Sequence, residues 1–353
     1  MTVLAPIGAL YGRALLVRRR RIESHPSSRR RLQHPVISIG NLSVGGSGKT
    51  PFVRWLALQL VSRGHRPSIL SRGYRRTSAI DEPVIVSDGH RVLADLAASG
   101  DEPLMLARAI LGAAVVVDPD RHRAGALAEN RLGCTVHLLD DGFQHLKLHR
   151  DINLLLLDEE DLEDRVLPAG RLREPLAAAR SADAVLWTGE SPERDIAARV
   201  GVAKVFALRR DAGPVRVHAP AHAVEAALFS CGVASSSAET VPPGTAVVAL
   251  AAIARPEPFF CQLERAGLDL RERLTYRDHH PYTDADLRRI ERTLNEARAS
   301  FVVTTEKDLT RLTAFGAPPF PVAWQPLDVV PRDVERFADW MAERLAFVGT
   351  EPS

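Results

Sequence analysis

A glycine-rich segment near the N-terminus is the strongest chemical signal in the sequence. It reads SVGGSGKT from Ser43 to Thr50, between an apolar run and a helix-forming stretch. Glycines in such a turn let backbone N–H groups converge on phosphate oxygens, and the helix that follows adds its positive N-terminus. Lys49 would then reach the β- and γ-phosphates, and the Thr50 hydroxyl would ligate Mg²⁺. The segment therefore predicts a site for a nucleoside triphosphate.

Each residue of this phosphate loop is a candidate for nucleotide contact. The strict motif has Gly or Ala five residues before Gly48, where this chain has Ser43. A glycine-rich β-turn without a ligand is the alternative interpretation. The predicted nucleotide-binding residues are Ser43, Val44, Gly45, Gly46, Ser47, Gly48, Lys49 and Thr50.

Two adjacent carboxylates follow a second apolar run. Asp140 and Asp141 end the segment VHLLDD, and the carboxyl end of a strand is where α/β proteins place ligand contacts. Beside a phosphate loop, such carboxylates hold Mg²⁺ directly or through water. Neighbouring carboxylates repel each other, and a divalent cation gives them a reason to coexist. An Asp-Gly turn is the alternative.

Two other segments carry acid–base residues whose role the spacing leaves open. Asp101 and Glu102 stand at the start of a predicted helix, where acidic residues are also favoured as caps. DHHPYT contains Asp278, His279 and His280. These residues could bind a metal, or a histidine could tune a carboxylate base across a domain cleft. A capped turn with solvated histidines is the third interpretation.

Alternating apolar runs and helical stretches must position these residues. The strands are almost continuously apolar, as buried parallel strands are, and they alternate with helices. This pattern predicts an α/β fold of the P-loop NTPase type, with a doubly wound parallel sheet covered on both faces. The predicted strands are residues 36–40, 115–117, 136–140, 152–158 and 184–188.

A second, smaller α/β domain is predicted after a polar turn near residues 211–214. Its predicted elements are strands 245–253, 301–305 and 322–326, a helix at 258–266 and a closing amphipathic helix at about 332–347. The predicted domains are a basic amphipathic segment at 1–32, a P-loop domain at 33–212 and the smaller domain at 213–353.

Charge is distributed unevenly along the chain. Residues 1–32 carry eight arginines and one acidic residue, a net +7, whereas the rest of the chain carries −5. Residues 4–21 form a predicted helix that is too short, and too interrupted by Arg13, to span a bilayer. The segment fits a helix lying on an anionic membrane face, or an ordinary capping helix with a solvated charge run.

The remaining composition excludes several classes of protein. No basic stretch interleaved with aromatic residues points to nucleic acid. Cys134, Cys231 and Cys261 match no zinc or disulfide framework, which indicates a reducing compartment. Only four lysines occur in this arginine-rich chain, and Lys49 and Lys307 lie within motifs, as expected where a compact point charge is needed.

Seven motifs in a fixed order resemble the tetraacyldisaccharide 4′-kinase family of lipid A biosynthesis in Gram-negative bacteria. They span about residues 4–345: GNLSVGGSGKTP, SRGY, GDEP, DDGFQH, LPAGRLREP, DHHPYT and TTEKD. The resemblance implies ATP- and Mg²⁺-dependent phosphorylation of the 4′-hydroxyl of a tetraacylated glucosamine disaccharide 1-phosphate, giving lipid IVA. It also implies a monotopic enzyme on the cytoplasmic face of the inner membrane, without an obligatory protein partner.

The same resemblance assigns roles to residues. Asp101 would be the general base, and His279, or else His280, would be its partner. The implied metal ligands are Thr50, Glu102, Asp140 and Asp141. The implied contacts to sugar or phosphate are Arg72, Tyr74, Arg171 and Arg173. The chain departs from the family pattern at Ala252, where the family usually has glycine.

Two alternatives remain on sequence grounds. A P-loop ATPase or GTPase switch acting on a partner protein is one, although a guanine site needs Asn-Lys-x-Asp and this chain has Glu306, Lys307 and Asp308. ATP is therefore favoured over GTP, and Lys307 either lies near the nucleotide or forms an ion pair at a helix start. A soluble small-molecule kinase with a basic surface segment is the second alternative.

Overall fold

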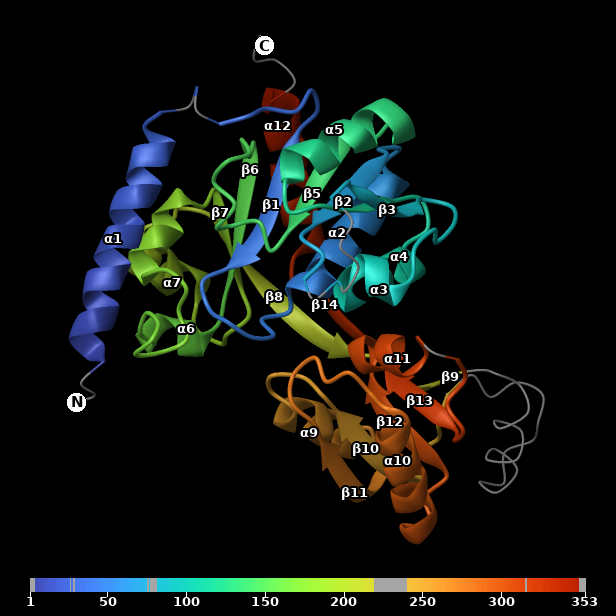
Figure 1. The fold of residues 1–353 in the computed structure, drawn as a ribbon. Helices are drawn as coiled ribbons and strands as arrows, with labels where there is room; N and C mark the ends of the chain where they lie inside the picture. Colours follow the sequence, from blue (N-terminus) through green and yellow to red (C-terminus); the bar gives the residue numbers. More distant parts are fainter. Residues whose placement is uncertain are drawn as a thin grey trace. The chain divides into compact units, whose positions relative to one another are not determined.

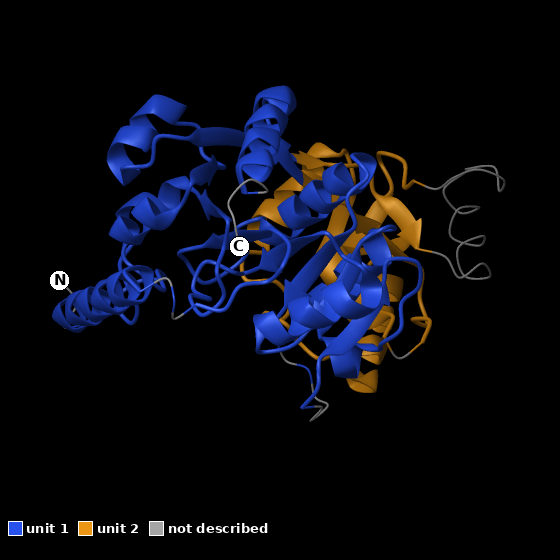
Figure 2. Ribbon diagram, turned by 90° about the horizontal axis from the view of Figure 1, so that it is seen from above, with its two compact units in different colours: residues 1–210, 329–353 blue, residues 211–328 orange. Residues whose placement is uncertain are grey.

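The computed structural model describes residues 4–25, 27, 29–74, 76, 81–218, 240–314 and 316–348. Figure 2 shows that the chain divides into two compact units. Unit 1 comprises residues 1–210 and 329–353, and unit 2 comprises residues 211–328. The chain therefore leaves unit 1 once and returns to it, so unit 1 is not continuous in sequence. Cys231, one of the three cysteines used in the sequence analysis, lies outside the described residues.

The core of unit 1 is a nine-stranded sheet (Figure 1). Its strands are β1 (Val36–Asn41), β2 (Pro67–Ser71), β3 (Val84–Asp88), β4 (Ala114–Val117), β5 (Val136–Asp140), β6 (Ile152–Leu157), β7 (Ala184–Trp187), β8 (Val205–Ala212) and β14 (Leu327–Pro331). They lie in the order β14-β8-β7-β6-β1-β5-β2-β4-β3. Neighbouring strands from β8 to β4 are parallel, and β3 is antiparallel to β4. The predicted parallel α/β fold is confirmed.

Helices cover both faces of this sheet. They are α1 (Ala5–Glu23), α2 (Lys49–Ser62), α3 (Leu96–Ser99), α4 (Asp101–Ala109), α5 (Arg121–Leu132), α6 (Glu159–Glu163), α7 (Glu193–Val200), α12 (Val334–Val348) and the 3₁₀ turn η2 (Leu176–Ser181). On one face, Ala124 and Ala128 of α5 pack against Leu70 and Val116. Every residue of β1 and β6 is buried, so these central strands are covered on both sides.

The C-terminal helix α12 belongs to unit 1. Its Phe337 contacts Phe52 of α2 and Phe206 of β8, with ring centroids 5.8 and 5.1 Å apart. Val205, the residue before Phe206, packs with α7, so α12 and α7 lie on opposite faces of the sheet. The prediction that this helix closes the smaller domain is therefore wrong. Its buried aromatic side chains complete the core of the larger unit.

Unit 2 contains a five-stranded sheet with the order β11-β10-β12-β13-β9. Its strands are β9 (Arg216–His218), β10 (Ala246–Ala251), β11 (Asp269–Thr275), β12 (Phe301–Thr305) and β13 (Val322–Gln325), and its helices are α9 (Glu257–Arg265), α10 (Asp284–Glu296) and α11 (Glu306–Leu312). Phe260 and Leu263 of α9 pack on one face, and Ile290 and Leu294 of α10 pack on the other. The second α/β arrangement is thus present, but it ends at Asp328.

Helix α1 is tied to the rest of unit 1 by a buried arginine. Arg19 is 2% exposed, and its Nε and Nη2 donate to the two carboxylate oxygens of Glu174 at 2.7 and 2.8 Å. Nη2 also donates to the carbonyl oxygen of Phe143 (3.0 Å). Among the helices of the described residues, none is both long and apolar enough to cross a bilayer. Residues 4–21 are therefore anchored to unit 1 by a charged contact.

Candidate active site

The predicted phosphate loop connects the carboxyl end of a strand to the start of a helix. β1 ends at Asn41 and α2 begins at Lys49, so residues 42–48 form the turn between them. Gly45 and Gly48 have φ of +115° and +90°, values that side chains with a Cβ rarely adopt. The sequence folds this way locally because glycine permits these two conformations. The loop thus has the strand, turn and helix context that phosphate binding requires.

Lys49 places a positive charge between the loop and the end of β5. Its Nζ donates to Asn41 Oδ1 (2.8 Å) and to Ser47 Oγ (3.3 Å). The same nitrogen lies 3.5 Å from Asp141 Oδ1. From outside the loop, Arg210 Nη2 donates to the carbonyl oxygen of Ser47 (3.0 Å). The backbone of the loop and the Lys49 ammonium are therefore both held by hydrogen bonds.

Arg173 adds a second cation at the same place. Its guanidinium donates to both carboxylate oxygens of Asp141 (2.7 and 2.8 Å) and also to Asn41 Oδ1. Its backbone N–H donates to the carbonyl oxygen of Leu42, so its segment runs beside the loop. Arginine offers this planar, paired geometry to carboxylates and phosphates alike. Asn41 contacts both cations, and sequence analysis missed it although it is the last strand residue before the loop.

Asp140 and Asp141 are neighbours with different surroundings. Asp140 is 3% exposed, and no hydrogen bond from the described residues reaches its Oδ1. Burial, reinforced by the charges of Glu102 and Asp141, raises the pKa of Asp140 to about 7. Burial also opposes ionisation of Asp141, but the charges of Lys49 and Arg173 outweigh it and lower the pKa of Asp141. The charge of Asp141 is thus neutralised by two cations, whereas the charge of ionised Asp140 is only partly offset.

Arg121, which the sequence patterns did not single out, is a third cation at this edge and is more deeply buried than Lys49 and Arg173. It is 5% exposed, and burial lowers its pKa to about 10 against the opposing charges of Asp140 and Asp141. The charge of Arg72, which follows β2, also acts on it. Its Nη1 donates to the carbonyl oxygen of Asp118 (3.3 Å). Arg121 could have been predicted as a site residue, because it lies four residues after a predicted strand, where the carboxyl ends of the parallel strands meet.

Asp101 begins α4 beside the SRGY turn. Gly100 has φ of +84°, and a Cβ there would lie 2.7 Å from the carbonyl oxygen of Tyr74, so the two segments touch. Asp101 is 6% exposed, and its Oδ1 accepts the backbone N–H of Glu102 (3.0 Å). The charge of Glu102 in turn acts on Asp140. The structure therefore brings the GDEP and SRGY motifs to the same edge of the sheet as the phosphate loop.

Arg171 lies next to the loop, but its side chain is engaged with acids. Its carbonyl oxygen accepts the backbone N–H of Val44 (2.9 Å). Its guanidinium forms ion pairs with Asp164 and Glu160, each at 2.8 Å. Of the two arginines in GRLRE, Arg173 thus contacts the charged centre and Arg171 borders the loop through its backbone.

The predicted histidines lie in unit 2. His279 has φ of +56°, and its Nε2 lies 3.0 Å from Lys307 Nζ and 3.9 Å from Asp278 Oδ2. His280 Nε2 contacts Asp286 Oδ2 (3.0 Å), a residue that caps α10. His280 therefore takes part in the local fold of unit 2. His279 shares its surroundings with Lys307, the second of the two motif lysines.

The oxygen donors at the edge of the large sheet suit Mg²⁺. This ion takes oxygen ligands and is bound in kinases by one or two carboxylates together with substrate phosphates. Asp140 Oδ1 is a buried carboxylate oxygen that no described residue satisfies. Such an oxygen is costly to bury unless a cation or donor meets it. Asp140 therefore fits a ligand of the ion, whereas both carboxylate oxygens of Asp141 accept from Arg173.

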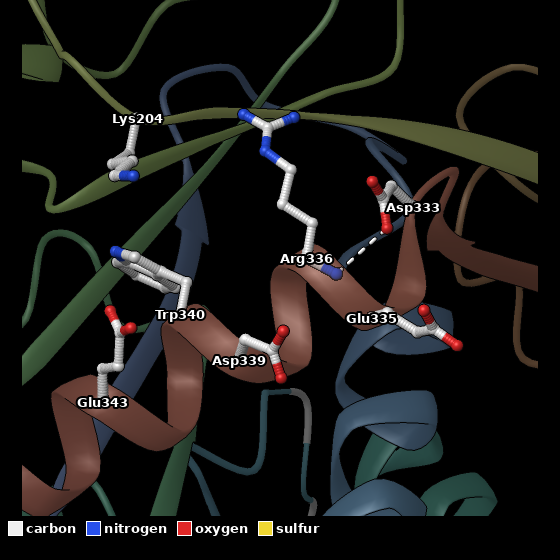
Figure 3. A pocket seen from close by; sticks show the side chains of 7 residues that line it. All are labelled: Lys204, Asp333, Glu335, Arg336, Asp339, Trp340 and Glu343. Carbon is white, nitrogen blue, oxygen red and sulfur yellow. Dashed lines mark hydrogen bonds between the residues drawn. The ribbon is translucent and has the colours of Figure 1, made fainter.

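A separate cavity of about 390 Å³ lies along α12 in unit 1 (Figure 3). Its lining residues are Lys204, Asp333, Glu335, Arg336, Asp339, Trp340 and Glu343. The backbone N–H of Arg336 donates to Asp333 Oδ1 (3.0 Å). None of the predicted site residues lines this cavity, so it takes no part in the site described above.

A glycine loop between a parallel strand and a helix, with a lysine and strand-end carboxylates beside it, defines a P-loop nucleotide-binding protein of the phosphotransferase type. The family model for Tetraacyldisaccharide-1-P 4′-kinase matches residues 1–346. The chain belongs to the tetraacyldisaccharide 4′-kinase family. The family predicted from the ordered motifs is confirmed.

Relatives in this family are similar to the chain over most of its length. A tetraacyldisaccharide 4′-kinase of Geobacter sulfurreducens is 41% identical over 336 residues, covering 94% of this chain and 90% of the relative. That of Aquifex aeolicus is 34% identical over 316 residues, covering 88% and 90%. A crystal structure of the "apo" form of LpxK from Aquifex aeolicus in complex with ATP is similar with a TM-score of 0.73 and 31% identity, covering 97% of this chain and 98% of that one.

Proposed function

We propose that this chain transfers the γ-phosphoryl group of ATP to the 4′-hydroxyl of a tetraacylated glucosamine disaccharide 1-phosphate. The observation that carries the proposal is the gathering of Lys49, Arg173, Asp140 and Asp141 beside a glycine loop at one sheet edge. Phosphoryl transfer needs alignment and charge neutralisation more than covalent help, and these side chains supply both. Membership of the family supports the choice of acceptor.

The donor triphosphate binds to the loop from Ser43 to Thr50. Backbone N–H groups and the N-terminus of α2 meet the phosphates, and Lys49 reaches the β- and γ-phosphate oxygens. Lys49 and Arg173 are both paired with Asp141. A triphosphate competes with Asp141 for these two cations, so the cations are already positioned when the nucleotide arrives.

Thr50, Glu102, Asp140 and Asp141 would hold Mg²⁺, which supplies charge neutralisation on the phosphate oxygens. The unsatisfied oxygen and raised pKa of Asp140 support this role, because a cation would offset the cost of burying its charge. Asp140 binds in its ionised form, so ion binding releases the proton that Asp140 holds below about pH 7.

Asp101 accepts the proton of the attacking hydroxyl. It is buried at the N-terminus of α4, whose dipole favours the ionised carboxylate. We propose that Tyr74 and Arg72, in the turn against Gly100, and Arg171 and Arg173, beside the loop, hold the sugar or its phosphate. Because DHHPYT resembles the family pattern, we also propose that His279 orients or tunes Asp101.

The acceptor lipid has four acyl chains, so the enzyme works at a membrane surface. Helix α1 supports a peripheral, monotopic position on the cytoplasmic face of the inner membrane. Its described residues expose large apolar side chains beside arginines. The exposed apolar residues are Leu4 (42%), Ile7 (54%), Leu10 (72%), Tyr11 (48%) and Val17 (65%).

The membrane role is tested without disturbing the buried Arg19. We expect the triple variant Ile7→Ser, Leu10→Ser, Val17→Ser to lose sedimentation with anionic vesicles while its ATP affinity is unchanged. Leu111→Ser is the matched control, since Leu111 is also 72% exposed but lies outside α1. Unchanged vesicle binding and unchanged activity on an acylated acceptor would instead favour the soluble small-molecule kinase.

Label transfer tests the function itself. The purified chain is incubated with γ-labelled ATP, Mg²⁺ and a tetraacylated disaccharide 1-phosphate, and the label is then located on the product. We expect the label at the 4′ position of the sugar. Release of the label as inorganic phosphate, stimulated by a protein and not by the glycolipid, would support the nucleotide switch instead.

A further inference from the structure

Three ligand-type side chains converge at the other edge of the large sheet, where its parallel strands begin. His137 is the second residue of β5, His34 precedes β1 by two residues, and Glu129 lies on α5. We propose that His34, Glu129 and His137 bind a divalent transition metal of the Zn²⁺ type. This site is separate from the Mg²⁺ ligands, and nothing in the proposed kinase reaction requires it.

The donor atoms already have nearly the spacing of a metal site. His137 Nε2 lies 3.1 Å and His34 Nδ1 lies 3.2 Å from the same oxygen, Glu129 Oε1. All three donor atoms lie within 4.8 Å of one another. In a tetrahedral zinc site with bonds of roughly 2.0–2.1 Å, neighbouring ligand atoms are about 3.4 Å apart. Small side-chain movements would therefore accommodate an ion between them.

Ser68 offers His137 an outer hydrogen-bond partner. Its Oγ, on β2, lies 2.7 Å from His137 Nδ1. In the tautomer with Nδ1–H donating to Ser68, the Nε2 lone pair faces Glu129 Oε1 and would ligate an ion between them. Metal-bound histidines usually donate their second ring nitrogen to such an outer partner, so Ser68 would fix the required tautomer.

Burial and charge at the cluster suit a bound ion. The His137 side chain is fully buried and that of Glu129 is 6% exposed, whereas that of His34 is 40% exposed. Glu129 Oε1 also accepts the backbone N–H of His34 (2.8 Å), which holds the carboxylate between the two imidazoles. The ion enters, and water completes its coordination, on the side of His34.

The donor set selects the class of metal. Two imidazoles and one carboxylate suit Zn²⁺ and similar ions, whereas Mg²⁺ and Ca²⁺ prefer oxygen ligands alone. A bound ion would join α5, β5 and the segment before β1. Since the ion binds the folded chain, it would raise the melting temperature of unit 1 without a part in catalysis.

Zinc content and melting temperature test the proposal. The full chain is stripped with chelator, mixed with equimolar Zn²⁺ without nucleotide, desalted and analysed by elemental mass spectrometry and calorimetry. We expect about one retained zinc per chain and a higher melting temperature than for the stripped protein. His34→Gln and Glu129→Gln should each weaken zinc binding by more than about tenfold. His65→Gln, which removes an exposed histidine outside the cluster, should retain zinc like the wild type.

Cobalt gives a second measurement that does not depend on stability. Co²⁺ bound by the cluster should give the visible absorption of a four-coordinate site in the wild type and in His65→Gln, but not in His34→Gln. The proposal is overturned if the wild type retains no metal. It is equally overturned if His34→Gln and Glu129→Gln retain as much zinc as the wild type, because the metal then lies elsewhere.

Discussion

Each compact unit buries an aspartate close to the carboxyl end of a parallel strand. The two aspartates differ in how many of their carboxylate oxygens receive hydrogen bonds. In unit 2, Asp308 of α11 is fully buried three residues after β12 and receives donors on both oxygens. In unit 1, Asp140 at the end of β5 is 3% exposed and has one oxygen that no described residue satisfies. The donors to Asp308 are Ala252 N (3.0 Å), Tyr282 OH (3.1 Å), Thr305 Oγ1 (2.7 Å) and Arg311 Nη2 (3.0 Å).

The difference distinguishes a carboxylate whose partners are supplied by the fold from one with an oxygen left for a ligand. Buried polar groups in native proteins are nearly always hydrogen-bonded, so an exception calls for a functional explanation. Asp308 ties β10, α11 and the DHHPYT segment together and needs nothing further. Asp140 leaves a charge incompletely compensated where a metal and triphosphate would bind. Substitution of Asp308 should therefore lower the stability of the fold, whereas substitution of Asp140 should raise it at a pH above about 7.

The largest effect is expected at the edge that contains Asp140. Asp101→Asn should lower kcat by about 10²–10⁴-fold, because the variant loses the base but keeps its shape. ATP affinity should stay near that of the wild type, since Asp101 is not assigned to the nucleotide. Steady-state kinetics with the lipid acceptor measure both. Asp95→Asn, which changes the capping aspartate of α3, is the control. Normal turnover of Asp101→Asn would remove this residue from the mechanism.

Asp308→Asn should damage the fold and leave the nucleotide site intact. The substitution breaks the buried ion pair with Arg311, which costs about 3–5 kcal/mol of unfolding free energy. Urea denaturation measures the loss, and Asp284→Asn at the exposed start of α10 is the control. The folded fraction should bind Mg·ATP like the wild type. Unchanged stability would break the contrast between the two aspartates.

Lys49→Met should reduce kcat/KM by about 10²–10³-fold, an effect comparable to the loss of one preorganised charge at a transition state. Added Mg²⁺ should not restore the rate, because the ammonium contacts Ser47 and Asn41 and not only Asp141. Lys147→Met at an exposed position is the matched control. If both substitutions reduced kcat/KM equally, Lys49 would not be the lysine that contacts the phosphates.

The two adjacent histidines give a smaller and sharper contrast. His279→Gln should lower kcat by about tenfold, as expected of a group that tunes the base, and should leave the melting temperature unchanged. His280→Gln should lower the melting temperature, because His280 contacts Asp286 and stacks on Tyr276 with ring centroids 4.7 Å apart. Steady-state kinetics and calorimetry of both variants measure kcat and the melting temperature. The reverse pattern would exchange their assigned roles.

Local sequence signals predicted the main parts of the fold and of the phosphate site. The strands at β1, β4, β5, β6 and β7 were predicted because buried parallel strands are continuously apolar. The loop from Ser43 to Thr50 was predicted because its glycines, lysine and flanking elements are contiguous. Strand-end position also predicted that Asp140 would lie near Lys49.

Long-range packing limited the rest of the prediction. The helix at about 332–347 was assigned to the smaller domain because an amphipathic pattern shows which face is buried but not against what. Its Phe337 in fact packs on Phe52 and Phe206 of unit 1. Arg121 and Asn41 were missed for a related reason. The charges that act on Arg121 and the Arg173 side chain that donates to Asn41 come from segments far away in sequence. The His34, Glu129 and His137 cluster likewise brings His34 to a residue 95 positions away.

The central claim is that Asp140 is buried for a ligand and not for the fold. Its pKa is raised from 3.8 to about 7, so the folded protein holds the proton more tightly than the unfolded chain does. Stability without ligand should therefore fall as the pH rises from about 4 to about 7 and stay lower above that range. Asp140→Asn removes this dependence.

Calorimetry of the wild type and Asp140→Asn at about pH 4 and about pH 8, with and without Mg·ATP, tests this most directly. In chelator at about pH 8, we expect the variant to melt a few degrees higher than the wild type, with little difference at about pH 4. Mg·ATP should stabilise the wild type and have little effect on the variant. A variant that melts lower at about pH 8 and keeps the full Mg·ATP stabilisation would contradict the claim.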